Sequence, residues 1–410
     1  MRPFSPAAPW RLRPDVIFLN HGSFGACPVP VLEHQRALQD ELESGPVAFL
    51  ATSFEDRIDA ARQATAAFLG ADPAGLVFVP NATTGVSTVL RSLRFEPGDE
   101  LLTIDHEYNA ALNALAEVAH AAGAKVVTAH LPLEIESDEQ VLETVLAAVT
   151  ARTRLVLVSQ ITSPTATILP VAALVRELDA RGIDTLVDGA HAPGQVPLDL
   201  RSVGAAYWTG NCHKWVCSPK GSAILVVRED RRSLVRPLTI SHGWNDARSD
   251  RSRLWKEFDW TGTGDPTAIL ALPTAIEVMG RLHPDGWPGV MAANHALALD
   301  GRDRVARALG VATRVPDRMF GSMAIIPLPI APTEAAARAL KATLMDEDRI
   351  EVPIVTWPVP AARRSPTDPP SALAVRISAQ LYNEPADYDR LAVALARRLG
   401  AALARRLGER

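Results

Sequence analysis

Short, unbroken apolar runs alternate with longer segments of helical periodicity over the first half of the chain. Such runs have no polar face, which is typical of strands buried on both sides in a parallel sheet. The segments between them repeat apolar residues three and four positions apart, which predicts amphipathic helices. We therefore expect a largely parallel sheet built from strand–helix–strand units. The predicted strands are 76–79, 100–104, 125–127, 154–158, 185–188 and 223–227, and the predicted helices are 81–93, 109–122, 138–149 and 171–181.

This pattern changes at both ends of the chain. A Pro-rich entry ends in a short strand at 16–19, and two helices at 31–43 and 54–69 stop at Gly45-Pro46 and Gly70. After a polar stretch from 230 to 265 and a helix at 266–281, Gly286-Trp287-Pro288-Gly289 marks a boundary. Beyond it we expect a smaller α+β unit with strands at 322–327 and 372–377, a helix at 333–346, an exposed loop at 358–371 and a C-terminal helix. The predicted divisions are an N-terminal arm, a large domain and a small domain, at 1–20, 21–285 and 286–410.

Composition narrows the class of protein. Of 410 residues, 47% are hydrophobic and 22% are charged, which is ordinary for a globular protein and excludes a disordered or fibrous chain. The net charge of −5 gives no reason to expect a nucleic-acid partner. No apolar stretch is long enough to span a membrane, and the N-terminus does not resemble a signal peptide. Three cysteines fit a reducing compartment, so we expect a cytoplasmic protein.

Polar, small-residue-rich segments follow five of the expected strands. Ligands of open parallel sheets bind beyond the carboxyl ends of the strands, so these segments predict a pocket. They are Asn81-Ala82-Thr83-Thr84-Gly85, Asp105-His106-Glu107-Tyr108-Asn109, Ser159-Gln160-Ile161-Thr162-Ser163-Pro164-Thr165, Asp188-Gly189-Ala190-His191 and Thr209-Gly210-Asn211-Cys212-His213-Lys214.

Three of these segments have both an ordinary and a functional interpretation. Asn81 or Thr83 either caps a helix or helps its N-terminus to bind a phosphate. Asp188 ends a buried strand and needs a partner, which is either a structural cation or the protonated ring nitrogen of a cofactor. Lys214 is either an ordinary surface lysine or a functional one. It stands between His213 and Trp215, which is unusual for a solvated lysine, and an amine of lowered pKa there would be a nucleophile toward a carbonyl.

Taken together, the chain resembles the fold-type I pyridoxal-phosphate (PLP) enzymes, and within them the isopenicillin N epimerase-like branch of the class V aminotransferase family. The resemblance covers nearly the whole chain, and its centre is an Asp-Gly-Ala-His segment followed by a His-Lys pair in the same order and spacing. The segments that carry it are Leu19-Asn20-His21-Gly22-Ser23-Phe24-Gly25, Ile161-Thr162-Ser163-Pro164-Thr165, Val187-Asp188-Gly189-Ala190-His191-Ala192-Pro193-Gly194, Cys212-His213-Lys214-Trp215-Val216-Cys217-Ser218-Pro219-Lys220-Gly221 and Trp260-Thr261-Gly262-Thr263-Gly264-Asp265-Pro266.

The resemblance implies an α/β fold: a mostly parallel seven-stranded sheet between helices, with a smaller α+β C-terminal domain. It also implies the cofactor pyridoxal 5′-phosphate, an amino-acid substrate and a homodimer with shared active sites. By the resemblance, Lys214 forms the Schiff base, Asp188 pairs with the pyridinium nitrogen, His191 lies near the ring and Tyr108 stacks on it. Ser163 contacts the phenolic oxygen, and the phosphate is bound by Ala82, Thr83, Asn211 and His213. Thr263 reaches the phosphate site of the neighbouring subunit, and Arg376 binds the substrate carboxylate.

The reaction stays open at this point, because one scaffold supports several chemistries. Epimerisation or racemisation at the α-carbon is the leading hypothesis, with Lys214 as base on one face and Tyr108 or His21 as candidate acid on the other. A C–S β-lyase and an aminotransferase are the alternatives, and a non-catalytic PLP-binding regulator is a remote one. The region 350–371 has no cysteine, which disfavours persulfide-forming desulfuration, and Cys212, His213 and Cys217 lack a fourth ligand for a metal.

Overall fold

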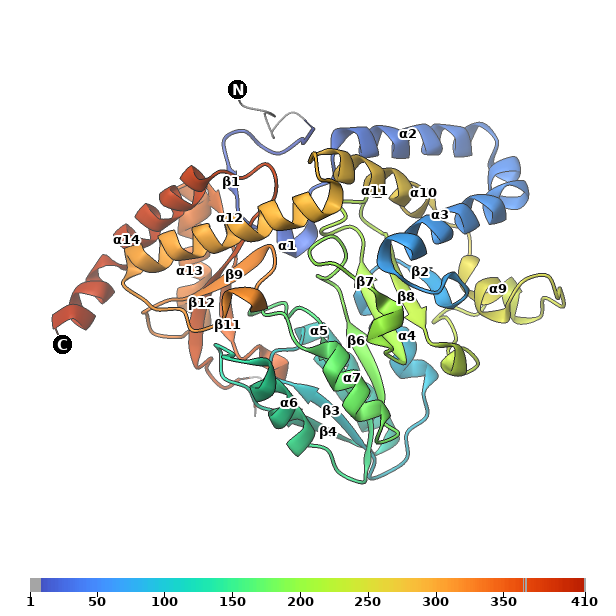
Figure 1. Cartoon of the computed structure of the whole chain (residues 1–410), viewed down its shortest axis with the longest axis horizontal. Helices are drawn as coiled ribbons and strands as arrows, with labels where there is room; N and C mark the ends of the chain where they lie inside the picture. Colours follow the sequence, from blue (N-terminus) through green and yellow to red (C-terminus); the bar gives the residue numbers. More distant parts are fainter. Residues whose placement is uncertain (1–8, 364, 366, 409–410) are drawn as a thin grey trace.

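A seven-stranded sheet forms the centre of the chain in the computed structural model, which describes residues 9–363, 365 and 367–408 (Figure 1). Its strand order is β2-β8-β7-β6-β5-β3-β4, and β8 alone runs antiparallel to its neighbours. The sheet prediction is confirmed. The strands are β2 (Leu76–Val79), β3 (Glu100–Ile104), β4 (Lys125–Ala129), β5 (Thr153–Ser159), β6 (Asp184–Asp188), β7 (Tyr207–Asn211) and β8 (Ala223–Val227).

Helices cover both faces of this sheet, which explains its unbroken apolar strands. Leu101 and Leu155 pack into one hydrophobic cluster with α4 and α5, whereas Leu102 and Val156 pack into another that includes α6 and α7. Gly85 lets α4 lie directly on β7, because a Cβ there would stand 2.0 Å from the Thr209 hydroxyl. The four helices are α4 (Ala82–Ser92), α5 (Asn109–Ala122), α6 (Asp138–Ala147) and α7 (Val171–Asp179).

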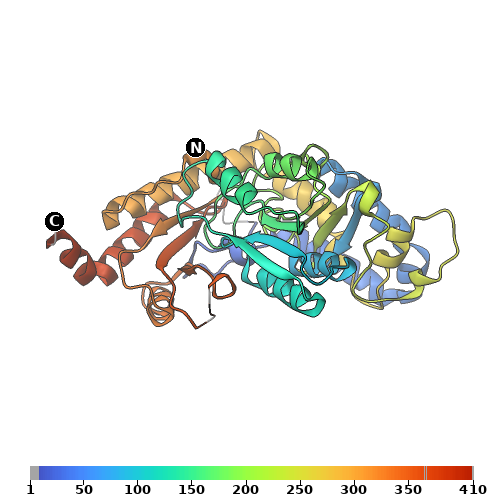
Figure 2. The same cartoon turned by 90° about the horizontal axis from the view of Figure 1, so that it is seen from below.

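The C-terminal elements gather at one end of the elongated molecule (Figure 2). They contain a three-stranded antiparallel sheet in the order β11-β12-β9, and α12 packs along α14. The predicted boundary between 285 and 286 coincides with the start of α12. The elements are α12 (Gly286–Leu309), β9 (Met323–Pro327), α13 (Glu334–Asp346), β10 (Ile350–Glu351), β11 (Ile354–Trp357), β12 (Ala372–Ser378) and α14 (Pro385–Gly408).

The N-terminal segment reaches back to the C-terminal elements. β1 (Ile17–Phe18) pairs in parallel with β10, and the Gly22 N–H donates to the Ser378 hydroxyl at 3.1 Å. Residues 1–8 of the predicted arm lie outside the described residues. The helices that follow are α1 (His21–Phe24), α2 (Val29–Ser44) and α3 (Phe54–Leu69).

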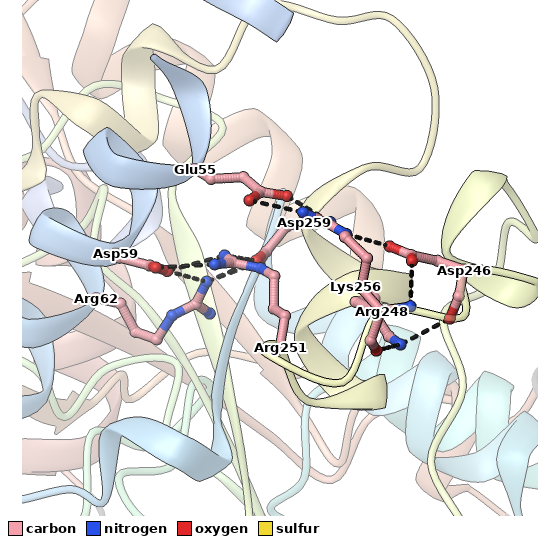
Figure 3. A network of polar contacts seen from close by, with 8 residues as sticks. All are labelled: Glu55, Asp59, Arg62, Asp246, Arg248, Arg251, Lys256 and Asp259. Atoms are coloured by element: carbon pink, nitrogen blue, oxygen red, sulfur yellow. Dashed lines mark hydrogen bonds and ion pairs between the residues drawn. The ribbon is translucent and has the colours of Figure 1, made fainter. Parts of the chain in front are cut away.

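The segment from 230 to 265, which has little sequence pattern, is held by ion pairs. Within it, α9 (Arg253–Asp259) faces α3 across a buried charge network (Figure 3). Arg62 and Arg251 both donate to the Asp259 carboxylate, at 2.8 and 2.6 Å, and the Arg62 side chain is completely buried. Arg251 also pairs with Asp59 at 2.8 Å. These contacts fix a loop that hydrophobic periodicity cannot locate.

Several elements differ from the sequence-based expectations. β7 was expected only as the strand before the 209–214 segment, without bounds, and α9, α12, β10 and β11 were not expected. The expected helix 266–281 is divided at Ala271 into α10 (Thr267–Leu270) and α11 (Leu272–Arg281). Pro273 in the first turn of α11 explains the division, since its nitrogen cannot continue the hydrogen bonds of a preceding helix. The remaining short helices are η1 (Ala48–Thr52), η2 (Pro73–Gly75), α8 (Leu200–Val203), η3 (Glu229–Arg231), η4 (His242–Trp244), η5 (Asp317–Met319) and η6 (Pro360–Ala362).

Among the described residues, no helix is long and apolar enough to cross a membrane. The same part of the chain contains no group of three or more His, Cys, Asp or Glu side chains that could hold a metal ion. Cys27, Cys212 and Cys217 are all buried and free.

Candidate active site

A cavity of about 350 Å³ opens at the carboxyl ends of the parallel strands. All five segments that the sequence singled out contribute to it, and two further segments, from α1 and from the turn before β8, complete its wall. This volume lies within the range of small-molecule sites. The lining residues are Ser23, Phe24, Pro80, Asn81, Ala82, Thr83, Tyr108, Ser159, Ile161, Ser163, Asp188, Ala190, His191, Asn211, His213, Lys214, Lys220 and Gly221.

The N-terminus of α4 forms one side of the cavity. Asn81 caps this helix by accepting from the Thr84 N–H at 2.8 Å. The Ala82 N–H instead donates to the Asn211 side-chain oxygen at 2.9 Å, which joins the helix to the end of β7. Both interpretations of this segment therefore apply. Asn81 caps the helix, and the positive N-terminal end of α4 faces a cavity that suits an anion, with Thr83 in the first turn.

Asp188 lies at the end of β6 and is only 4% exposed. Its carboxylate accepts from the Ala190 N–H at 2.9 Å, and no ion-pair partner for it occurs among the described residues. Burial is the main reason that the pKa of Asp188 is raised. The structural cation, one of the two alternatives for Asp188, is thus missing among the described residues, and the carboxylate is available to a positively charged group in the cavity.

Lys214 follows β7, and its amine is 3.1 Å from the Nε2 atom of His191. Burial, and after it the Arg376 charge, lowers the pKa of Lys214 to about 7, and the charge of Asp188 opposes both effects. Burial also keeps the pKa of His191 well below its usual value, so that the imidazole is neutral beside the lysine. At neutral pH a large fraction of the Lys214 amine is unprotonated and nucleophilic.

The N-terminal segment packs directly on the lysine loop. Gly25 has φ +70°, and a Cβ there would lie 2.3 Å from the His213 carbonyl oxygen. The Lys220 ammonium donates to the Gly25 carbonyl at 2.6 Å. The position therefore requires glycine, both for its backbone conformation and for the close approach.

Arg376 comes from β12, in the C-terminal sheet, and its guanidinium contacts two residues that line the cavity. The guanidinium donates to the backbone carbonyl of Ser163 and, at 3.1 Å, to the Ser23 hydroxyl. The Nε–H of Arg376 is buried without a partner among the described residues. Burial lowers the pKa of Arg376 to about 10, so it still carries a full charge at neutral pH.

Three residues of the predicted site, Arg376, His21 and Thr263, are not among the residues that line the cavity. Both nitrogens of His21 are already engaged, by the Tyr382 hydroxyl at 2.8 Å and the Lys214 carbonyl at 3.0 Å, and burial lowers the His21 pKa to about 3. This arrangement argues against His21 as an acid or base. Thr263 is exposed and lies beside Gln39 and Asp265, away from the cavity of its own chain.

Several lining residues were not expected as site residues. Ser159 belongs to a strand-end segment that the sequence had singled out, and Ser23, Phe24 and Lys220 belong to segments quoted for the resemblance. Their segments were therefore identifiable, but their orientation was not. Glu107 is hidden behind the wall and has no pattern that distinguishes it from a solvated loop residue.

The donor set fits pyridoxal 5′-phosphate. A buried carboxylate without a cation suits a pyridinium nitrogen, an uncharged amine suits an aldehyde, and a helix N-terminus with neighbouring polar side chains suits a phosphate. These groups line a single cavity at one edge of the sheet. Fold and site together define a PLP-dependent enzyme of fold type I.

Comparison with known proteins gives the family. The model of the class-V aminotransferases matches residues 35–391, and the chain belongs to that family of PLP-dependent enzymes. It is 32% identical over 398 residues to isopenicillin N epimerase of Amycolatopsis lactamdurans, covering 94% of this chain and 95% of the relative. It is 28% identical over 399 residues to L-cysteine desulfhydrase of Arabidopsis thaliana, covering 92% of this chain and 86% of the relative.

The fold prediction is confirmed by solved structures. A mutant of C-DES with glycine covalently linked to its PLP cofactor superimposes with a TM-score of 0.76 at 21% identity, covering 93% of this chain and 97% of that chain. The cofactor and the family predicted from the sequence are thus confirmed. The relatives include both an epimerase and a desulfhydrase, so the family leaves the reaction open.

Proposed function

We propose that this protein removes and returns the α-hydrogen of an amino acid, with epimerisation or racemisation as the net reaction. The observation that carries the proposal is the position of Lys214, whose amine has a pKa of about 7 and lines the same cavity as Asp188 and Tyr108. A base works best when its pKa is near the working pH, and Lys214 meets that condition.

When bound, PLP supplies an electron sink for negative charge at the substrate α-carbon. Lys214 would anchor it covalently and act as base on one face of that carbon. Asp188 would keep the ring nitrogen protonated, with His191 beside the ring. Ser163 would bind the phenolic oxygen, and Ala82, Thr83, Asn211 and His213 would hold the phosphate.

Tyr108 is the candidate acid on the opposite face. Its side chain is 43% exposed and lines the cavity from the start of α5. With His21 withdrawn from the cavity, epimerisation depends on Tyr108 alone. The second candidate function is a C–S β-lyase. The absence of His21 from the cavity favours it, because elimination needs only the lysine base and no acid on the opposite face.

Incubation with a panel of amino acids in deuterated water separates these functions. Deuterium uptake with inversion of configuration supports the epimerase, pyruvate with sulfide supports the lyase, and a keto acid with loss of the amino group supports an aminotransferase. Either of the last two results, without inversion, contradicts the epimerase proposal. The control is the same panel with Tyr108→Phe, which should retain elimination and lose inversion.

Replacing Arg376 by lysine is expected to raise KM for amino acids by roughly 10–100-fold and to change kcat less. We propose that the guanidinium binds the substrate carboxylate in a bidentate manner, and a lysine offers only a point charge, which costs about 1–3 kcal/mol. Steady-state kinetics checks this. The matched control is an amine substrate that lacks the carboxylate, for which both enzymes should have the same KM. An unchanged KM for the amino acid contradicts the assignment of Arg376.

We propose a homodimer in which Thr263 reaches the partner's cavity. Thr263 is absent from the lining of its own cavity, and the exposed apolar side chains of Val47, Ile240 and Trp244 are available to an interface, so both observations support the proposal. Sedimentation at twice the chain mass is expected, and a monomer with full activity would contradict the proposal. The free, buried thiols support a cytoplasmic location, which cell fractionation tests.

A further inference from the structure

Glu107 is a completely buried carboxyl group just behind the cavity wall. One oxygen, Oε1, accepts from the Ser159 hydroxyl at 2.6 Å and from the Tyr108 N–H at 2.7 Å. The other oxygen, Oε2, is buried without a hydrogen-bond partner among the described residues. A buried carboxylate normally has a cation or several donors on both oxygens, and this group has neither.

The two partners of Glu107 belong to opposite parts of the site. Ser159 stands directly opposite Asp188 in the β5–β6 ladder, and both line the cavity. Tyr108 lines the cavity from the start of α5. A single carboxyl oxygen therefore joins the strand beside Asp188 to the residue that we assign to the opposite face of the substrate.

We propose that Glu107 is a positioning residue that holds a proton at neutral pH, so that Asp188 is the only carboxylate charge facing the ring nitrogen, and that fixes Tyr108 against β5. This inference rests on the proposed roles of Asp188 and Tyr108. It adds a group that touches neither substrate nor cofactor and acts through both of these residues.

The electrostatic surroundings support a protonated Glu107. Burial, followed by the charge of Asp188 on β6, raises the pKa of Glu107 to about 8, against which Ser159 and the Tyr108 N–H act weakly. In its own segment, Asp105 is paired with His130, and His106 is engaged by Thr165 and has a pKa lowered by burial.

The cations of the site do not bind Glu107. Lys214 contacts His191, and Arg376 contacts Ser163 and Ser23. A ring cation paired with Asp188 would offset part of that residue's charge, and burial, which is the larger cause of the raised pKa, still favours the protonated form of Glu107. Above its pKa, Glu107 ionises and adds a second negative charge beside Asp188.

A spectroscopic titration of the holoenzyme tests the proposal. The visible band of bound PLP in the wild-type protein is expected to change on the alkaline side of neutrality as Glu107 ionises. Glu107→Gln keeps the size of the side chain and cannot ionise, so this transition should be lost while the neutral-pH spectrum is retained. The control is Asp105→Asn. Asp105 is a buried carboxylate two residues away that pairs with His130, and its substitution should leave the transition in place.

The opposite results are equally definite. If Glu107→Gln and the wild type titrate identically, the proposal is wrong. If Glu107→Gln does not fold, Ser159→Ala serves instead: it removes a donor to the ionised form and should move the transition to higher pH. An unmoved transition in that variant also overturns the proposal. A wild-type protein that binds no PLP overturns the proposed function itself, which distinguishes the two failures.

Discussion

Replacing Lys214 by alanine is expected to abolish covalent retention of PLP and to lower the rate of α-hydrogen exchange by at least roughly 10³-fold. The variant loses both the group that would bind the aldehyde and the base of lowered pKa on one face of the α-carbon. Borohydride reduction followed by mass measurement of the chain checks the first effect. Deuterium uptake by the substrate checks the second.

Lys220 offers a matched control inside the same cavity. It lines the wall near Lys214, but its ammonium is held by the Gly25 carbonyl. Lys220→Ala should therefore still gain the mass of the reduced cofactor, whereas Lys214→Ala should not. Covalent retention of PLP by Lys214→Ala would overturn the assignment of the anchoring lysine.

Replacing Asp259 by alanine is expected to lower the free energy of unfolding by about 3–5 kcal/mol, because it leaves a buried arginine without its main counter-charge. Arg62 is 0% exposed and would keep only a 3.3 Å contact with Asp59, which is itself 35% exposed, and the Leu76 carbonyl. The Arg62 guanidinium also stacks over the Trp255 ring, but this contact supplies no negative charge to replace Asp259. Urea unfolding at a fixed protein concentration measures the loss.

The control for this substitution is Glu41→Ala, which removes an ion pair between α2 and α3 on the surface. Glu41 is 51% and Arg57 30% exposed, so water screens this pair and the same kind of deletion should change the free energy of unfolding little. A loss at Asp259 no larger than the loss at Glu41 would show that water reaches the Arg62 guanidinium and that the Arg62–Asp259 pair in Figure 3 is not a buried one.

The sheet was predictable because its strands are apolar on both faces and separated by amphipathic helices. β3 was predicted to the residue. β7 was not, since Gly210 and Asn211 interrupt its apolar pattern, although they follow Tyr207 and Trp208 in the most buried part of the sheet. β11 is half-buried along its whole length and has no strong pattern.

The site was predictable to the extent that it consists of strand-end segments. Lys214, Asp188 and Tyr108 come together because parallel strands end at one edge. His21 was expected there as well, but the same motif that brings α1 to the cavity turns its imidazole toward Tyr382. Glu107 could not be recognised, because its importance depends on burial and on partners that sequence spacing does not reveal.

The pairing of β1 with β10 also governs when the cavity can be completed. Ser23 and Phe24 form part of its wall, and they follow a strand whose partner, Ile350–Glu351, comes much later in the sequence. This wall can therefore dock only after the segment around β10 has been made and has folded. Contacts between residues so far apart in sequence form slowly, so we expect the cavity to be completed late in folding.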